Sequence, residues 1–437
     1  MPLMPAVLAS RLSGLESRFR IWTIASTMVP TMGALGLQLV TFALTARGLG
    51  VEQFGRYTAL LAVVAVGVEA IGMGGADLLV RAVSRNKEAF GTYYGNMLLG
   101  IALTLPVAVL AGTLVAAGIL RVEVALPFIA LALFAEIGLA RVSASTELAM
   151  VAHAQTARAG WVRVATVVAR LVAALLFFIV LERHALDEWI VCLSVQSVAM
   201  MAFYAWLGAR LYGAPRWVLL GGEMKSGFLF CANQGARAMQ SNLDRMVLSR
   251  FADAYSLGVY GAASRILQLG LFPMQVMTRI FYPKFFQHGA NGMAASRAYA
   301  LRVAPALFGA GVLSGAMVAC AALLAPHVLG RDFAGSVEVT AGLALSLPFI
   351  ALQYPAADAL TGAGRQGIRA VIYGVAAVGF GFVLVAGVWL KGVPGLIGAF
   401  VFAQFLLAAI LWGAAFRCKD VPDGIAPANT IYVDEGK

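Results

Sequence analysis

One apolar stretch of the chain carries polar and charged side chains at helical spacing. They are Asn233, Arg237, Gln240, Ser241, Asp244 and Arg245. Because an α-helix has 3.6 residues per turn, these offsets place all six side chains along one face. Arginine offers a permanent charge and a planar fork of N–H donors that matches phosphate and carboxylate oxygens. The pattern predicts a cationic helix face that can bind an anionic ligand.

The composition of the whole chain makes such a face unusual. Hydrophobic residues form 61% of the sequence, charged residues form 12%, and the mean hydropathy is +0.85. A soluble domain has roughly 25% charged residues. Segments such as 89–120 and 303–330 contain no Asp, Glu, Lys or Arg and exceed the about 20 residues that a helix needs to cross a bilayer. They are apolar throughout rather than alternating, which favours helices over strands.

The sequence therefore predicts an all-α, polytopic integral membrane protein. We expect about twelve transmembrane helices in two six-helix lobes with a central cavity. The expected helices lie near 21–45, 58–78, 92–118, 126–151, 161–181, 189–210, 228–249, 256–280, 301–325, 339–362, 370–390 and 394–416.

The distribution of Lys and Arg predicts the orientation. The first twenty residues are basic and precede a long apolar span, so we expect a cytoplasmic lead-in rather than a cleaved signal peptide. Basic residues are also more frequent in the alternate loops that share a side with the N-terminus, which places both termini in the cytoplasm. Topology thus accounts for the net charge of +11, and no nucleic-acid partner is expected.

A short motif occurs twice, and it indicates an internal duplication. Each copy follows the first helix of a predicted half: Arg47-x7-Gly55-x-Tyr57 and Arg250-x7-Gly258-x-Tyr260. We interpret the glycines as turn residues and the tyrosines as anchors at the membrane interface.

The duplication predicts a domain organisation. The N-terminal lobe covers 1–211, a cytoplasmic linker covers 212–227, and the C-terminal lobe covers 228–437. An even number of helices in each half gives both lobes the same orientation, an arrangement that transporters use with the substrate path between lobes.

Two segments around these motifs resemble a known family. They are LTARGLGVEQFGRYTALL and NLDRMVLSRFADAYSLGVYGAASRILQL. They are similar to Wzx-type polysaccharide and O-antigen flippases of the multidrug/oligosaccharidyl-lipid/polysaccharide (MOP) exporter superfamily. The resemblance implies transport of undecaprenyl-diphosphate-linked oligosaccharide repeat units across the bacterial inner membrane, from the cytoplasmic to the periplasmic leaflet. It also implies a role in O-antigen or exopolysaccharide biosynthesis, with a polysaccharide polymerase and glycosyltransferases as partners beside membrane lipid.

A charged side chain within the hydrocarbon layer is costly unless it faces water or a partner. We therefore expect the intramembrane polar residues to line a cationic cavity for a lipid-linked diphosphate. For Asp244 and Arg245, an internal ion pair and contact with the ligand remain equal alternatives. The expected binding residues are Arg237, Arg245, Asn233, Gln240, Asp244, Arg265, Gln268, Gln38 and Arg170.

Four acids inside predicted helices form a second set of candidates. Glu69, Glu136, Glu147 and Asp358 could couple transport to a proton or sodium gradient, or could form structural ion pairs. We single out Glu69 for coupling because no basic residue lies within four positions of it.

Other functional classes find less support. The chain has no phosphate-binding loop of the G-x-x-x-x-G-K-[ST] type, and its four cysteines have no paired spacing. We expect no enzyme activity, no cofactor and no metal. The alternative function is a MATE-like or other secondary exporter of small molecules, although an arginine-lined cavity favours anionic cargo.

Overall fold

The computed structural model describes residues 4–418. Side chains are described from Val29 onward, except those of residues 225, 226, 229, 230, 232 and 233. Regular structure within this part is helical, without strands. Contacts divide the chain into two compact units, Met1–Gly261 with Ala325–Ala334 and Ala262–Leu324 with Gly335–Lys437. Each unit is described by itself.

The first helix of unit 1, α1 (Met4–Ala70), is a helical hairpin. The chain reverses at Gly50, whose φ of 72° and ψ of 167° lie outside the helical region. The rings of Phe42 and Phe54 are therefore 5.7 Å apart. Twelve residues of straight helix would separate them by roughly 18 Å. The hairpin confirms two separate helices at the start of the chain.

The second predicted helix, near 58–78, is discontinuous. α1 ends at Ala70, a 3-10 turn covers Gly72–Gly74, and α2 covers Gly75–Arg85. Met73 takes a positive φ of 50° in this break. The freed Gly74 N–H donates to Cys231 Sγ at 2.9 Å, so a neighbouring helix satisfies the interrupted backbone.

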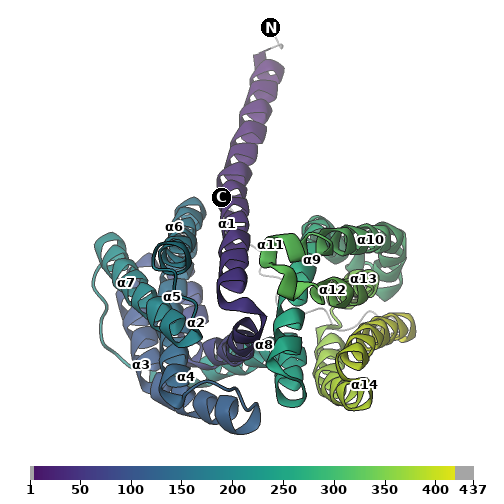
Figure 1. Ribbon diagram of the computed structural model, residues 1–437. Helices are drawn as coiled ribbons and strands as arrows, with labels where there is room; N and C mark the ends of the chain where they lie inside the picture. Colours follow the sequence, from purple (N-terminus) through teal and green to yellow (C-terminus); the bar gives the residue numbers. More distant parts are fainter. Residues whose placement is uncertain (1–3, 419–437) are drawn as a thin grey trace. The chain divides into compact units, whose positions relative to one another are not determined.

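Five further helices of unit 1 follow in order: α3 (Phe90–Leu114), α4 (Leu126–Leu133), α5 (Ala140–Ala152), α6 (Thr156–Leu175) and α7 (Leu186–Tyr212). A wider π-helical turn, Phe134–Leu139, joins α4 to α5 in one stretch, and similar turns, Val115–Ile119 and Leu176–Val180, extend α3 and α6. Figure 1 shows α5, α6 and α7 side by side.

Two longer, more polar helices come next. α8 (Met224–Phe251) packs along α1, and its Gly227 lies against the backbone of Met73 and Gly74. α9 (Ala254–Gly289) belongs to unit 1 up to Gly261. α8 therefore packs with the helices of the first repeat, although the second repeat of the sequence begins with it.

The two copies of the repeated motif meet inside unit 1. Gly55 lies against the backbone of Ala254 and Gly258, and Gly258 lies against the backbone of Val51. Val51 and Ala254 are themselves equivalent in the two copies, so the contact has the reciprocal form of a two-fold interface. The expectation of turn glycines is wrong, because both positions lie inside helices with ordinary backbone angles.

The motif tyrosines also differ from expectation. Tyr57 and Tyr260 are buried inside unit 1, with 7% and 0% of their surface exposed, rather than anchored at the membrane interface. Small glycines nearby let the helices approach closely enough to enclose these rings.

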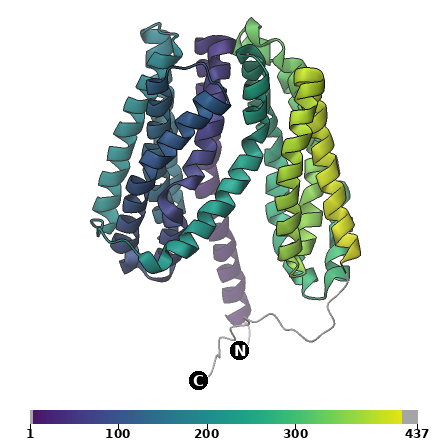
Figure 2. The same ribbon diagram turned by 90° about the horizontal axis from the view of Figure 1, so that it is seen from below.

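Unit 2 continues α9 and adds four helices: α10 (Met293–Ala322), α12 (Ser336–Ala344), α13 (Leu347–Gly362) and α14 (Gln366–Arg417). The intervening α11 (Ala325–Leu329) and a 3-10 turn, Arg331–Phe333, pack in unit 1, where Phe333 contacts Phe54. α14 is a second hairpin, reversing at Lys391 and Gly392. Its Phe380 and Phe400 rings are 5.6 Å apart, and Figure 2 shows its two halves, in yellow tones, side by side.

Eight helical stretches are long and apolar enough to cross a membrane within the part of the chain that the structure describes. Two of them, Val29–Arg85 and Gln366–Arg417, contain the hairpins and so contribute more than one span each. α8 and α9 are not among the eight, because their arginines and amides lower the hydropathy of otherwise sufficient lengths of 28 and 36 residues. The all-α, polytopic membrane fold is confirmed; the central cavity stays a prediction.

Candidate anion-binding site

Two groups of arginines inside the helices concern the candidate site, and the first group is paired with acids. Arg170 contacts Glu136 at 2.7 Å, and Arg163 contacts Glu147 at 2.9 Å. Arg141 contacts Glu69 at 3.2 Å, and Arg369 contacts Asp358 at 3.4 Å. All four acids predicted as coupling candidates therefore have a guanidinium partner.

The pair of Glu69 shows why its partner was missed. Arg141 is 72 positions away along the chain and lies on α5, whereas Glu69 lies at the end of α1. The side chain of Arg141 is 12% exposed, so the pair is largely enclosed. A coupling role for Glu69 stays a prediction, but its carboxylate already forms an ion pair with Arg141.

Arg170 was predicted to contact substrate. Its Nη2 donates to Glu136 Oε1 at 2.7 Å and to Tyr57 Oη at 3.3 Å. The motif tyrosine of the first repeat thus holds the Arg170–Glu136 pair in place. The contact between Arg170 and Tyr57 was not predicted from the sequence. The only indication that Tyr57 has a structural role was its presence in the repeated motif.

The second group consists of Arg237 and Arg245, two of the three arginines on α8. Arg237 is exposed, and no hydrogen bond or ion pair is found for its guanidinium among the described residues. Arg245 donates from Nη1 to Asn242 Oδ1 at 3.0 Å, and its Nε is buried without a partner among those residues. Neither Arg237 nor Arg245 has a carboxylate in ion-pair contact within the described part of the chain.

Asp244 lies beside them but does not neutralise them. It is buried, and its Oδ2 accepts a hydrogen bond from Tyr260 Oη at 2.6 Å. Its Oδ1 has no hydrogen-bond partner among the described groups. Of the two alternatives for Asp244 and Arg245, an internal ion pair is not found among the described residues; contact with a ligand stays a prediction.

The remaining predicted binding residues are spread over three helices. Gln38 is exposed on α1, and Gln240 is half-buried on α8. Arg265 donates to Gln268 Oε1 at 3.5 Å on the part of α9 that belongs to unit 2. The side chain of Asn233 lies outside the described residues. Their convergence around one ligand stays a prediction.

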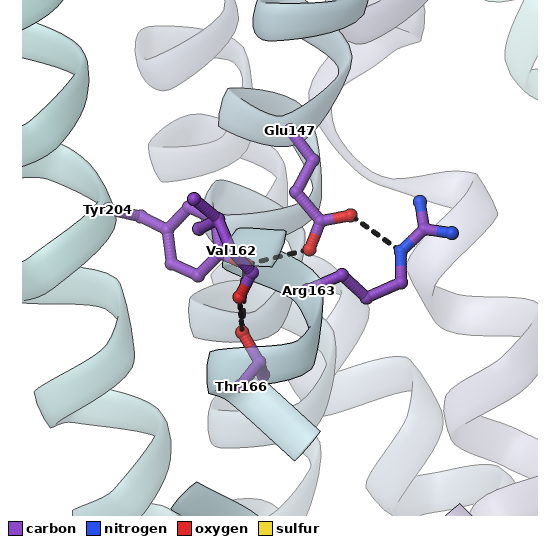
Figure 3. Close-up of polar contacts among 5 residues, drawn as sticks. All are labelled: Glu147, Val162, Arg163, Thr166 and Tyr204. Carbon is purple, nitrogen blue, oxygen red and sulfur yellow. Dashed lines mark hydrogen bonds and ion pairs between the residues drawn. The ribbon is translucent and has the colours of Figure 1, made fainter. Parts of the chain in front are cut away.

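A polar cluster behind Arg163 was also missed from the sequence. Glu147 accepts from Arg163 Nε at 2.9 Å and from Tyr204 Oη at 2.7 Å, while Thr166 Oγ1 is 2.8 Å from the same tyrosine oxygen (Figure 3). Three helices, α5, α6 and α7, supply these groups. The i, i+3 spacing of Arg163 and Thr166 was the only local signal.

One groove lies elsewhere and has a different chemistry. It has a volume of about 810 Å³ and is formed by α3 and α4. Its walls are apolar, including Leu105, Pro106 and Phe134, and its one hydroxyl, that of Thr113, donates to the carbonyl of Val109. No charged residue lines this groove, so it is not suited to bind an anion. The candidate anion-binding site is therefore defined by Arg237 and Arg245.

Comparison with known proteins decides the family. The model of the polysaccharide biosynthesis protein family matches residues 22–288, more than half of the chain. The chain belongs to this family. The predicted resemblance to polysaccharide flippases of the MOP superfamily is confirmed at that level. A search of curated protein sequences found no match.

This chain is similar in fold to several solved structures. A multidrug resistance MATE family transporter of the MOP superfamily, in an inward-facing conformation, has a TM-score of 0.73 at 14% identity, covering 90% of this chain and 97% of its own. The lipid II flippase MurJ, in an inward closed conformation, has a TM-score of 0.69 at 12% identity, covering 89% and 87%. The family member therefore has the fold of MOP-superfamily transporters.

Proposed function

We propose that this protein is a flippase that moves undecaprenyl-diphosphate-linked oligosaccharide repeat units from the cytoplasmic to the periplasmic leaflet of a bacterial inner membrane, by alternating access. The observation that carries the proposal is the state of Arg237 and Arg245. Both lie on a helix of a membrane protein, and neither has an acidic partner among the described residues. Such charges are costly in a membrane unless water or an anion compensates them.

A diphosphate fits the chemistry of these side chains. Each guanidinium offers several N–H donors in one plane, and charge-assisted contacts to phosphate are among the stronger hydrogen bonds in proteins. The fold similarity to a lipid II flippase and membership of a polysaccharide biosynthesis family support a lipid-linked oligosaccharide as cargo. A polysaccharide polymerase and glycosyltransferases are the proposed partners, and both termini are proposed to be cytoplasmic.

An exporter of cationic drugs, as in a MATE transporter, is the alternative. Four of the acids that could bind a cation are here engaged with arginines, as in Glu136–Arg170 and Glu69–Arg141, whereas Asp244 is held by Tyr260. A cationic substrate would have to displace a guanidinium to reach them. This observation favours anionic cargo, with a proton or sodium gradient as the proposed energy source.

Deletion of the gene tests the proposal. We expect a deletion strain to accumulate undecaprenyl-diphosphate-linked repeat units, and wild-type protein to remove them. Resistance to ethidium, a cationic exporter substrate, should not change between the two strains. Unchanged lipid-linked intermediates together with loss of ethidium resistance would establish the alternative instead.

A further inference from the structure

Arg163 presents an unused donor fork although it is paired with an acid. It contacts Glu147 through Nε, the inner nitrogen of the guanidinium, at 2.9 Å. Figure 3 shows its two outer nitrogens pointing away from the carboxylate. No protein partner is found for these two groups among the described residues. Arg141 and Arg170 differ, because each contacts its acid through an outer nitrogen.

The exposure of Arg163 is not exposure to lipid. Half of its side chain, 49%, is accessible. The lipid-type face of α6 carries exposed Trp161, Val168 and Val172, which fall within a narrow sector of the helix. Each residue advances the helix by about 100°, so Arg163 lies on the opposite side, on the same face as Thr166 and Arg170. The free fork therefore opens on a polar face of unit 1.

Glu147, the partner of Arg163, is held in place by a buried tyrosine. Glu147 has 12% of its side chain exposed, and Tyr204 is fully buried. The single hydroxyl proton of Tyr204 goes to the carboxylate oxygen, the charged acceptor, at 2.7 Å. Thr166 Oγ1 lies 2.8 Å from Tyr204 Oη and 3.3 Å from the carbonyl oxygen of Val162. These hydrogen bonds hold Glu147 in place, and Glu147 holds the Nε of Arg163.

The position of Arg163 along α6 suggests when it acts. α6 begins at Thr156, so Arg163 lies about two turns, or roughly 10 Å, inside the helix. Arg237 lies roughly 20 Å from the start of α8, which begins on the same side of the membrane if α6 and α7 both span it. Counted from the start of its own helix, Arg163 is therefore nearer to that side than Arg237 is.

We propose that Arg163 is a receiving site for the diphosphate on the side of the membrane where α6 begins, and that Glu147, Tyr204 and Thr166 are positioning residues for it. The two outer nitrogens bind phosphate oxygens while Nε stays on Glu147. The proposal rests on the proposed function, since it assumes a diphosphate-linked substrate.

Binding of two probes to the purified protein tests this site. Farnesyl diphosphate and farnesyl monophosphate are titrated calorimetrically into wild type and variants. We expect Arg163→Lys, which keeps the charge but lacks the fork, to weaken diphosphate binding about tenfold and monophosphate binding less. Tyr204→Phe should weaken diphosphate binding about threefold, because it frees Glu147 to move. Arg183→Lys, in an exposed pair with Glu188, is the matched control and should change nothing.

The outcomes separate the two proposals. Wild-type protein that binds neither probe would contradict the proposed function itself. Wild-type binding that Arg163→Lys leaves unchanged would overturn only the receiving site. An equal loss of both probes in Arg163→Lys would also overturn it, because a merely structural effect does not distinguish one phosphate from two. Where Arg163→Lys unfolds, Tyr204→Phe with wild-type affinity for both probes gives the same contrary result.

Discussion

Gly55 and Gly258 occupy equivalent positions of the repeated motif and touch each other backbone to backbone. A Cβ atom at Gly55 would lie 2.8 Å from Gly258 N, closer than real Cβ contacts come. The same glycines bring α1 and α9 together around two buried tyrosines. The duplicated sequence thus marks a helix contact rather than two separate turns.

Adding one methyl group at this contact should destabilise the protein. We expect Gly55→Ala or Gly258→Ala to lower stability by about 1–3 kcal/mol, because rigid backbone blocks the new atom. Thermal unfolding in detergent measures the change. Gly36→Ala in the same α1 is the control, since nothing lies within 4 Å of its Cβ position. Equal midpoints for Gly55→Ala and Gly36→Ala would refute the contact.

The hydrogen bond from Tyr260 to Asp244 should matter for stability. Tyr260→Phe leaves a buried carboxylate without its donor at 2.6 Å, at a cost of about 1–3 kcal/mol. The exposed Tyr255 serves as control, and Tyr255→Phe should leave the unfolding midpoint in place. A harmless Tyr260→Phe would show that Asp244 is not held in this way.

The Glu69–Arg141 pair should show energetic coupling. Glu69→Gln and Arg141→Gln each leave a partly enclosed charge unpaired, so each should destabilise, while the double variant should lose less than the sum. A double-mutant cycle on unfolding free energy measures the difference, which we expect to exceed about 1 kcal/mol. The exposed Arg183–Glu188 pair should give less than that. Additive losses at Glu69 and Arg141 would argue that the pair is not structural.

Hydropathy was enough to locate most of the helices, because a membrane span must be long and apolar and satisfy its own backbone. The helical spacing of the polar residues between Asn233 and Arg245 allowed α8 to be recognised despite its low hydropathy. The break at Met73 was not foreseen, although the flanking Gly72, Gly74 and Gly75 were a local signal for it. The groups that pack against the break, Cys231 and Gly227, come from a helix distant in sequence. The sequence around Met73 does not predict the contacts of the break with Cys231 and Gly227.

The candidate site was predictable in composition but not in pairing. Residue types and helix phase placed Arg237 and Arg245 on one face. Whether an arginine finds an acid depends on helices far apart in sequence, as Glu136 and Arg170 show at a separation of 34 positions. Glycine in the motif was misread because its missing side chain serves close packing as well as turns.

Flipping in proteoliposomes tests the central claim most directly. A fluorescent polyprenyl-diphosphate-linked oligosaccharide is placed in both leaflets, and its transfer to the accessible leaflet is followed by quenching. We predict that the double variant Arg237→Ala/Arg245→Ala lowers the rate at least about tenfold relative to wild type, as expected for loss of charge-assisted contacts. The exposed arginines Arg183 and Arg331 provide a double-alanine control that should flip normally. Wild-type flipping by the Arg237→Ala/Arg245→Ala protein would contradict the account.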